Sequence, residues 1–349
     1  MRSIQLIARV NQGGTARWLE NLIFGLRERG HDTYLLAGHV QSGESEDSIF
    51  VELNGIRVNR LGRKISIFSD FLAILEIRNK IREIRPEVLN THTAKAGLLG
   101  RIAAIGMKTK VVHTFHGHLL HGYFSPFRTK IYIFIEKALA LISDNLISVG
   151  MHVKNDLIEF KIGNQSKFKV IYPGIEVKEI NIIKKNSNFT IGWLGRLTKI
   201  KRPERLLEIA NEFPHVRFLI GGDGDLFEET NRNSPANVKL VGWVDPAEFW
   251  PICDLGLLTS ENEGMPTALI EAGLFGIPVV AWDVGSVNEI VKDGQTGILV
   301  SNSFEAREAL SDLIHDQNRI SKYSKNAKKF CQETFGLKRF IDEHLEVYT

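Results

Sequence analysis

Short apolar runs rich in β-branched residues alternate with amphipathic segments along the whole chain. In the first half, residues 14–30 have helical spacing, and the expected strands are 3–10, 32–38, 87–93, 110–117 and 145–150. A second series of expected strands occupies 189–195, 216–222, 238–242, 254–260, 277–283 and 296–300. Strands that alternate with helices in this way predict parallel sheets with crossover helices. The expected fold class is therefore α/β, with two doubly wound parallel-sheet domains.

The length of the chain also favours two domains. At 349 residues it exceeds the usual size of one hydrophobic core. A turn at Pro173-Gly174 is followed by a polar stretch rich in Lys and Asn, which is typical of a linker. We therefore expect a first domain over 1–173, a linker over 174–188 and a second domain over 189–334.

Composition excludes several classes of protein. Apolar residues make up 43% of the chain and charged residues 24%, as in folded proteins, and the two cysteines are too isolated for a disulfide framework or a cysteine metal site. The N-terminal apolar run is broken at Arg9, and the most apolar later stretch is broken at Glu136 and Lys137. We therefore expect neither a signal peptide nor a membrane-spanning helix, and a cytoplasmic location.

Charge is divided unevenly between the two halves. Residues 1–175 hold 24 Lys and Arg against 15 Asp and Glu, a net charge of +9, whereas the remaining residues hold 20 against 26, a net charge of −6. The basic half is expected to face something anionic, such as a membrane surface or an acidic ligand. Nucleic acid is not expected, because no stacking motif or DNA-binding pattern accompanies the charge.

Two stretches after expected strands of the second domain carry candidate chemistry. Arg196 and Lys201 stand before a helix opened by a proline, where free amides and the helix dipole favour a diphosphate; the alternative is a solvated basic loop. Glu263 falls in the loop before a helix expected from Thr267, and Glu271 falls on the second turn of that helix. Two carboxylates beside an anion-binding helix end suit a nucleotide sugar, which has hydroxyls at both ends and phosphates between them.

These stretches resemble the successive motifs of glycosyltransferase family 4, the retaining GT-B enzymes that use nucleotide-sugar donors. The resemblance is closest over 190–300, which contains GRLTKIKRPERLLEIA, GGDGD and SENEGMPTALIEAGLFGIPVV, and it extends to GGTARWLENLIFGLRERGHD and VVHTFHGHLLHGYF. It implies two Rossmann-like domains facing each other across a cleft, and a final helix over 335–349 that crosses back to the first domain. Ser286 departs from the pattern, because the family usually has a second glycine there, which puts the local backbone geometry in doubt.

The resemblance implies a role for each matching residue. Arg196 and Lys201 would neutralise the donor diphosphate, and Glu271 would accept hydrogen bonds from the ribose hydroxyls. Glu263 would hold the donor sugar, and the catalytic set would be His116, Arg196, Lys201 and Glu263. The other donor-binding positions are Gly13, Gly14, Gly195, Gly222, Val244, Gly264, Met265, Pro266, Thr267 and Ala268.

Four histidines lie within nine residues, at the end of the expected strand 110–117 and in the loop after it. A metal site is one interpretation of the His-x-x-His-x-His spacing. However, strand alternation sends His113 and His116 to opposite faces, and no carboxylate or cysteine joins the cluster, so no metal site is expected. The resemblance instead implies that His116 contacts the donor sugar. His118 and His121, together with Thr15, are acceptor-side candidates.

A hydrolase with a catalytic carboxylate pair is a chemical alternative, since retaining glycosidases place two carboxyl groups about 5 to 5.5 Å apart. Such an enzyme has no use for two cations and a helix end directed at a diphosphate. The resemblance implies transfer with retention on one face of the sugar, in which the departing phosphate oxygen helps to deprotonate the acceptor. It implies no cofactor and no divalent metal, because the two cations replace the metal.

The basic first domain is expected to hold the acceptor, a glycan that we expect to be lipid-linked, as in polysaccharide or O-antigen assembly. One basic stretch holds Arg57, Arg60, Arg63 and Lys64, and another, 123–143, combines aromatic residues with three cations. Basic residues beside apolar ones suit peripheral docking on an anionic leaflet, here the inner face of the cell membrane. The alternative for the second stretch is a buried crossover helix.

Three other functions stay open. A GT-B sugar-nucleotide epimerase or phosphorylase would carry different motifs or a pyridoxal phosphate lysine. A non-catalytic nucleotide-sugar-binding subunit of a partner transferase would not need to keep the whole set of candidate residues. A nicotinamide dehydrogenase would need a G-x-G-x-x-G after the first strand, which is absent. Among donors, the resemblance favours a UDP-sugar over a guanosine one.

Overall fold

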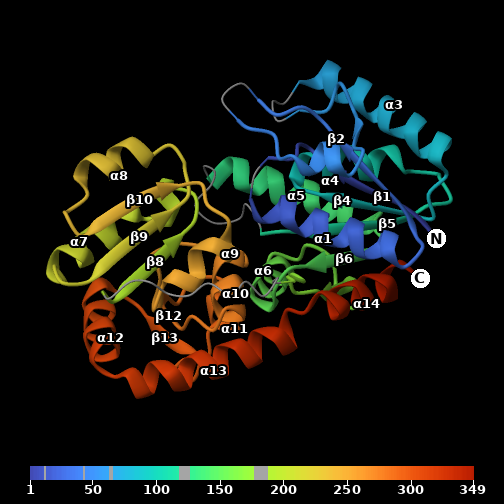
Figure 1. Ribbon diagram of the computed structural model, residues 1–349. Helices are drawn as coiled ribbons and strands as arrows, with labels where there is room; N and C mark the ends of the chain where they lie inside the picture. Colours follow the sequence, from blue (N-terminus) through green and yellow to red (C-terminus); the bar gives the residue numbers. More distant parts are fainter. Residues whose placement is uncertain (12, 42–43, 63–65, 118–125, 177–187) are drawn as a thin grey trace. The chain divides into compact units, whose positions relative to one another are not determined.

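Two compact units make up the computed structural model of this chain (Figure 1). Unit 1 comprises Met1–Gly174 and Leu337–Thr349, and unit 2 comprises Ile175–Gly336. Most of the linker expected over 174–188 lies outside the residues that the structure describes. The described residues are 1–11, 13–41, 44–62, 66–117, 126–176 and 188–349.

In the described part of unit 1, seven parallel strands form a sheet in the order β3-β2-β1-β4-β5-β6-β7. The order reverses at β1, which pairs with β2 on one side and with β4 on the other. Ile4 and Leu6 of β1 join the core on one face of the sheet, and Ile7 joins the core on the other face. The strands are β1 (Arg2–Ile7), β2 (Asp32–Ala37), β3 (Ile56–Arg57), β4 (Val88–His92), β5 (Lys110–Phe115), β6 (Asn145–Ser148) and β7 (Phe168–Val170).

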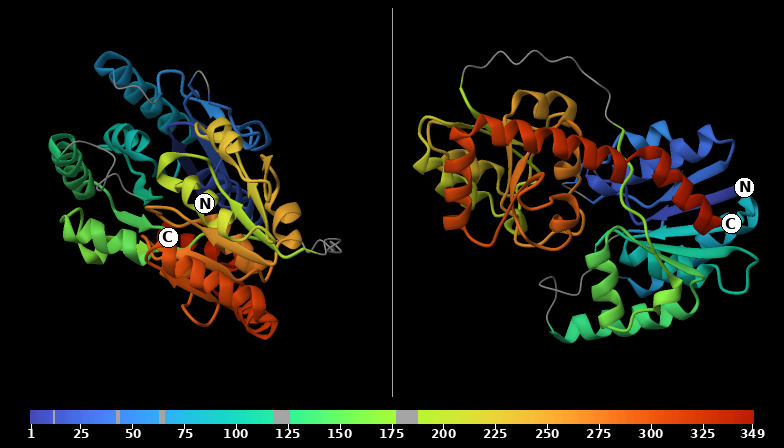
Figure 2. Two further views of the ribbon diagram at one scale, coloured as in Figure 1. Left: turned by 90° about the vertical axis from the view of Figure 1, so that its left-hand side faces the viewer. Right: turned by 90° about the horizontal axis from the view of Figure 1, so that it is seen from below.

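Helices cover both faces of this sheet. α3, α4 and α5 lie side by side on one face, whereas α1 and α14 lie together on the other (Figure 2). A buried ion pair joins Arg101 of α4 to Glu136 of α5 at 2.7 Å. The helices of unit 1 are α1 (Gly14–Glu28), α2 (Ile49–Glu52), α3 (Ile67–Ile84), α4 (Ala94–Ala103), α5 (Pro126–Leu141), α6 (Met151–Glu159) and α14 (Leu337–Tyr348).

Among the residues of unit 2 that the structure describes, six parallel strands form a sheet in the order β10-β9-β8-β11-β12-β13. The order reverses at β8, because β8 pairs with both β9 and β11. The strands are β8 (Thr190–Leu194), β9 (Arg217–Gly221), β10 (Val238–Gly242), β11 (Leu255–Leu258), β12 (Val279–Trp282) and β13 (Gly297–Val300). The helices are α7 (Pro203–Glu212), α8 (Phe227–Asn233), α9 (Pro246–Phe249), α10 (Thr267–Leu274), α11 (Val287–Ile290), α12 (Ser303–His315) and α13 (Gln317–Thr334).

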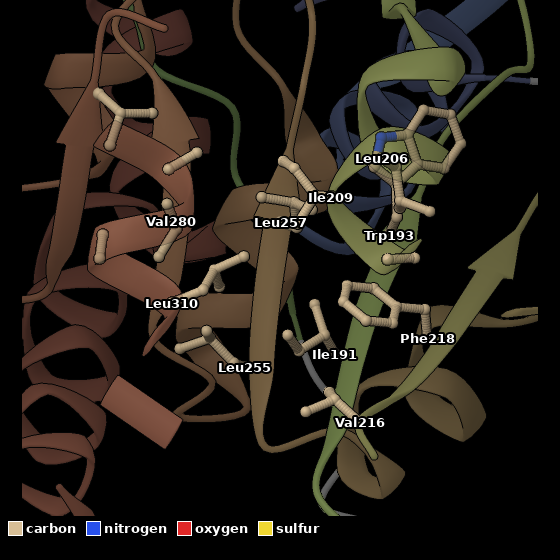
Figure 3. Packing of buried hydrophobic residues seen from close by; sticks show 14 of the residues in the cluster. Ile191, Trp193, Leu206, Ile209, Val216, Phe218, Leu255, Leu257, Val280 and Leu310 are labelled. Atoms are coloured by element: carbon tan, nitrogen blue, oxygen red, sulfur yellow. The ribbon is translucent and has the colours of Figure 1, made fainter. Parts of the chain in front are cut away.

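The main core of unit 2 lies between the sheet and the helices α7 and α12. Its fully buried side chains include Trp193 of β8, Phe218 of β9 and Leu310 of α12 (Figure 3). The apolar runs of the neighbouring strands are almost continuous because both faces of a parallel sheet are covered by helices. This core fixes the positions of the strand ends that carry the candidate residues.

The expected α/β class with two doubly wound parallel sheets is confirmed, and each strand expected from the apolar pattern is present. The short edge strands β3 and β7 were not expected. The crossover helix expected within 123–143 is present, because α5 joins the parallel strands β5 and β6. The expectation that this helix is buried is wrong for Phe127 and Phe134, which are 73% and 74% exposed. Among the helices that the structure describes, none combines the length and the apolar character needed to cross a membrane.

Candidate functional site

The candidate residues of unit 2 lie at the point where its strand order reverses. β8 and β11 are neighbours, yet the chain leaves β8 toward β9 and returns to β11 only after β10. The loops that follow two such strands diverge, which opens the usual ligand position of doubly wound sheets at their carboxyl ends. Arg196 and Lys201 follow β8, and Glu263 follows β11.

An ion pair joins the two loops at this point. Lys201 Nζ lies 2.5 Å from Glu263 Oε1, and Ser260 Oγ donates to the same oxygen at 2.5 Å. The Lys201 backbone is also fixed, because Thr259 Oγ1 donates to its carbonyl at 2.9 Å and accepts from Trp193 Nε1 at 2.9 Å. Glu263 is only 8% exposed, so its carboxylate depends on these partners for stabilisation. The structure therefore brings together two of the predicted catalytic residues, Lys201 and Glu263.

Gly285 supports Glu263 from the other side. It has a φ of +56°, and a Cβ at this position would lie 1.8 Å from the Glu263 carbonyl oxygen. Two independent constraints, the left-handed backbone and the close approach, therefore require glycine here. Ser286 has an ordinary φ of −92°, so the doubt raised by the missing second glycine is removed.

The helix α10 begins directly after this loop. The first amides of α10, those of Thr267 and Ala268, have no acceptor within the helix and form its positive end. Gly264 and Thr267 are half-buried, whereas Met265 and Pro266 are buried. Glu271 is half-buried one turn further along the helix, as predicted from its spacing.

Arg196 differs from Lys201 in its surroundings. Its side chain is exposed, and it forms no hydrogen bond or ion pair with any residue that the structure describes. It stands on the loop between β8 and the turn that carries Lys201, so both cations belong to one strand end. The guanidinium is thus available for an anion, whereas the ammonium is already paired.

The ends of β8, β9 and β10 bring together Gly195, Gly222 and Val244. A Cβ on Gly222, which has a φ of +125°, would lie 2.0 Å from the Gly195 carbonyl oxygen, and a Cβ on Gly221 would meet Val244. The Gly195 amide donates to the Gly221 carbonyl at 3.0 Å, and the Gly222 amide donates to the Gly242 carbonyl at 2.6 Å. These residues form one backbone surface beside Arg196.

The candidate residues of unit 1 also lie where strand order reverses, next to β1 and β4. Gly13 is the N-cap of α1, Gly14 opens that helix, and both are exposed, while Thr15 is half-buried. His116 follows β5, and its ring packs edge-on against Trp18 of α1 with centroids 5.1 Å apart. The start of α1 and His116 therefore share one end of the sheet. His118 and His121 lie outside the described residues.

His116 is hydrogen-bonded to a histidine that the sequence did not single out. Its Nε2 lies 2.8 Å from Nδ1 of His92, which ends β4. Burial and the nearby imidazole of His344 lower the pKa of His116 to about 3, so the ring is neutral at pH 7. His113 lies on the opposite face of the sheet, against Gly97 of α4, as the strand alternation predicted.

Thr93, next to His92, has a backbone conformation that is rare for a residue with a side chain. Its φ of 68° and ψ of 154° fall in a region used almost only by glycine, and such strain concentrates at functional sites. It lies at the N-terminus of α4, directly after β4. A histidine and a threonine at the end of a central strand are signals that sequence reasoning could have used, because ligands bind at those ends.

The candidate residues thus form two groups, one in each unit. Unit 2 contributes two cations, two carboxylates and a helix N-terminus, a set suited to a diphosphate that carries hydroxylated groups. Unit 1 contributes a glycine loop and a neutral histidine, a set suited to hydroxyl groups. No group of three or more His, Cys, Asp or Glu among the described residues is arranged to hold a metal ion.

Comparisons with known protein families account for nearly the whole chain. Residues 12–179 match the model of Glycosyltransferase Family 4, and residues 176–330 match that of the Glycosyl transferases group 1. The chain is 26% identical to an Escherichia coli UDP-Gal:alpha-D-GlcNAc-diphosphoundecaprenol alpha-1,3-galactosyltransferase, over 88% of this chain and 87% of the relative. It is 24% identical to CapM, a capsular polysaccharide biosynthesis glycosyltransferase of Staphylococcus aureus, over 88% of each chain.

Solved structures share the fold. The crystal structure of Anabaena HepE in complex with UDP and glucose superposes with a TM-score of 0.82, at 20% sequence identity, over 99% of this chain and 98% of that one. The sucrose-phosphate synthase from Thermosynechococcus elongatus superposes with a TM-score of 0.81 at 18% identity, over 100% of this chain and 98% of that one. Both likenesses establish the GT-B architecture of two Rossmann-like parallel-sheet domains.

Replacing Gly285 by alanine tests how much of the stability at this position comes from its left-handed backbone and how much from its close contact with the Glu263 loop. We compare it with Gly294→Ala, because Gly294 has a similar φ of +66° but open space at its Cβ position. The control should cost about 1 kcal/mol for the left-handed backbone alone. Gly285→Ala should cost about 2 kcal/mol more, because the Glu263 loop must move and the pair with Lys201 is disturbed. Urea unfolding followed by circular dichroism measures both, and equal losses in the two variants would contradict the structural role.

Proposed function

The chain belongs to glycosyltransferase family 4, and from this premise we propose that it transfers a sugar from a UDP-sugar to a lipid-linked glycan in the assembly of a cell-surface polysaccharide. The relatives that act on a diphosphoundecaprenol-linked sugar and in capsule biosynthesis support this choice of pathway and acceptor. The family decides against the epimerase and dehydrogenase alternatives. The two groups of candidate residues supply the physical argument for the reaction.

One observation carries the donor assignment: the contact of Lys201 Nζ with the buried Glu263 carboxylate at the β8–β11 strand ends, beside the exposed Arg196. In this arrangement Glu263 fixes the position of the ammonium group, and Arg196 is free to meet a second charge. The diphosphate of the donor would lie between these cations and the N-terminus of α10. Glu271 would then accept hydrogen bonds from the ribose.

The proposed reaction breaks the bond between the anomeric carbon and the diphosphate oxygen, and forms a bond from that carbon to an acceptor hydroxyl on the same face of the sugar. Negative charge builds up on the departing diphosphate, and Arg196 and Lys201 stabilise it in the transition state. The departing oxygen takes the proton of the acceptor hydroxyl, so no side-chain base is needed. Because the two cations supply the positive charge, the reaction requires no divalent metal and no cofactor.

The acceptor is assigned to unit 1, whose exposed surface suits a lipid-linked molecule at a membrane. On α5, the exposed residues Phe127, Ile131, Phe134 and Leu141 follow one another at helical spacing, flanked by exposed Arg128 and Lys130. On α3, the exposed residues Ile67, Phe68, Phe71 and Leu75 form a similar stripe. These apolar stripes lie on helices of the same face of the sheet (Figure 2).

The two basic stretches that the sequence singled out differ in how far their charges are already paired. Arg57 forms two hydrogen bonds with Glu46, at 2.7 and 2.9 Å, and stacks on Phe50, so its charge is already compensated. Arg63 and Lys64 lie outside the described residues. The proposed membrane contact therefore rests on α5, where cations and apolar side chains occur together. We propose peripheral binding of the cytoplasmic protein to the inner leaflet.

A thermal-shift panel of UDP-, GDP- and ADP-sugars, with and without EDTA, tests the donor. A UDP-sugar should raise the melting temperature by an amount that EDTA does not change, because binding at a hundredfold excess over Kd adds about 2.7 kcal/mol of stability. Glu271→Ala should abolish the shift through loss of the ribose contact. Glu261→Ala is the matched control, since Glu261 is an exposed carboxylate in the same loop region. Stabilisation by another nucleotide family, or a shift that EDTA removes, would contradict the proposal.

Neutralising Lys201 should mainly reduce turnover. Lys201→Gln is the better variant, because the amide still donates to Glu263 and does not leave a buried carboxylate unpaired. The loss of charge should lower kcat by about a hundredfold while KM for the donor changes little, as expected for a group that acts mainly in the transition state. UDP release measures both constants. Turnover at the wild-type rate in Lys201→Gln would remove its proposed role, and Lys201→Arg should retain more activity.

Vesicle flotation tests the membrane contact. The chain should float with phosphatidylglycerol vesicles at low salt and less at high salt, and it should not float with phosphatidylcholine vesicles. Phe127→Ser/Phe134→Ser should reduce the bound fraction at least about tenfold, since each phenyl group contributes about 1.5–3 kcal/mol when buried. Phe304→Ser is the control, because Phe304 is 64% exposed on α12 of unit 2. Equal binding of both variants would contradict the assigned surface.

A further inference from the structure

A chain of hydrogen bonds, part-buried at His116 and buried beyond it, leads from His116 to the helix α14. His116 Nε2 lies 2.8 Å from His92 Nδ1, and His92 Nε2 lies 3.0 Å from Gln5 Oε1 in the neighbouring strand β1. Gln5 Nε2 in turn donates to the Tyr348 hydroxyl of α14 at 3.1 Å. Gln5, His92 and Tyr348 are each at most 3% exposed. The four side chains therefore form one continuous path inside unit 1.

The direction of these hydrogen bonds follows from the amide of Gln5. Its Nε2 donates to the Tyr348 hydroxyl, and its Oε1 lies 3.0 Å from His92 Nε2 and also accepts from the Tyr348 hydroxyl at 3.3 Å. An amide oxygen can only accept, so the hydrogen bond with His92 must be donated by the imidazole. His92 must then carry its proton on Nε2, which leaves Nδ1 as an acceptor. His116 must donate to that acceptor from its own Nε2. The remaining nitrogen of His116, Nδ1, is left with a lone pair.

Burial makes this arrangement specific, because each ring then carries a single N–H. Desolvation lowers the pKa of His92 well below its ordinary value, and it lowers the pKa of His116 to about 3. Both imidazoles are therefore neutral at pH 7, and only one tautomer of each satisfies the chain of hydrogen bonds. A neutral histidine whose second nitrogen is committed has its tautomer set by that partner.

Packing from α14 holds the same path in place. Trp18, which contacts the ring of His116, packs edge-on against Phe340 with centroids 4.7 Å apart and against His344 at 5.5 Å. The Tyr348 hydroxyl also accepts from Asn90 Nδ2 at 2.8 Å. Two amide groups, on β1 and β4, thus converge on one phenol oxygen. The position of α14 is therefore coupled to the orientation of His116.

We propose that Gln5, His92 and Tyr348 are positioning residues that fix the tautomer and ring orientation of His116, so that its Nδ1 accepts a hydrogen bond from a hydroxyl of the donor sugar. The contact with the donor sugar rests on the proposed function. The fixed tautomer does not, because it follows from the contacts within unit 1. In this arrangement a residue of α14 controls the polarity of the hydrogen bond between His116 and His92 at the carboxyl end of β4.

Nitrogen-15 NMR of the full chain labelled at histidine tests the tautomer directly, with His116→Gln to assign the signal. His116 should be neutral and protonated at Nε2 at pH 7. In Gln5→Leu, His92 loses its acceptor, and a buried unpaired N–H is costly, so both rings should shift toward the Nδ1-protonated form. Tyr348→Phe frees the Gln5 amide to rotate and should give a mixture of forms. Ser3→Ala is the control, because Ser3 is buried on the same face of β1 but bonds to Thr33.

Two results would overturn the proposal: His116 protonated at Nδ1 in the wild-type chain, or an unchanged His116 signal in both Gln5→Leu and Tyr348→Phe. Tyr348→Phe changes one hydroxyl group only, so it remains informative if Gln5→Leu does not fold. These outcomes are independent of any substrate.

Turnover separates this inference from the proposed function. With the UDP-sugar selected by thermal shift, Tyr348→Phe should lower kcat/KM about tenfold, the effect of one weakened hydrogen bond. It should have no further effect in a His116→Ala background, because both changes act through one group. If His116→Ala alone leaves turnover unchanged while the NMR shifts occur, the positioning stands and the sugar contact fails. If Tyr348→Phe lowers turnover equally in both backgrounds, Tyr348 acts by another route and the positioning fails.

Discussion

Parallel strand pairing is the constraint on which the rest of this structure depends. A parallel strand cannot be reached by a tight turn, so the chain must cross over each sheet through a helix and enter every strand from the same edge. All carboxyl ends of a sheet consequently lie at one edge, and each sheet has one place where the order reverses, beside β1 in unit 1 and beside β8 in unit 2. The candidate residues of both units lie at that edge because only there do loops diverge enough to leave room for a ligand.

The burial of polar groups at those strand ends then determines whether a side chain is held there as a charged group or as a neutral one. In unit 2 the Glu263 carboxylate is removed from water, a cost of several kcal/mol that its contacts with Lys201 and Ser260 offset. In unit 1 the side chains that contact His116 and continue from it to Tyr348 are neutral, and they satisfy one another through hydrogen bonds rather than charge. Unit 2 therefore presents fixed charges at its strand ends, and unit 1 presents fixed dipoles at its own.

The sequence predicted the fold well where the pattern was long. Each expected strand is present, since runs of several apolar residues bounded by Gly or polar residues leave little choice. The sequence did not predict β3 and β7, because two or three residues at a sheet edge, such as Ile56–Arg57, are too few to show an alternation of apolar and polar positions. The apolar residues of α5 surround the helix, so the sequence could not show which of them, like Phe127, point to solvent. Which of them are covered depends on how α5 packs in the folded structure, including its contact with α4.

In the candidate site, too, the sequence predicted residues that lie close together along the chain better than contacts between residues far apart in it. Arg196, Lys201 and Glu263 lie in motifs whose residues are close in sequence, and family resemblance identified them. The role of His92 depends on Gln5, 87 residues away, and that of Tyr348 on the same residue across 343 positions. The amphipathic spacing of α14 shows which of its faces is buried, but not that a tyrosine on this face meets the amide of Gln5. A buried hydrogen-bond network is specified by three-dimensional satisfaction of donors and acceptors, and this is why it appears only in the folded structure.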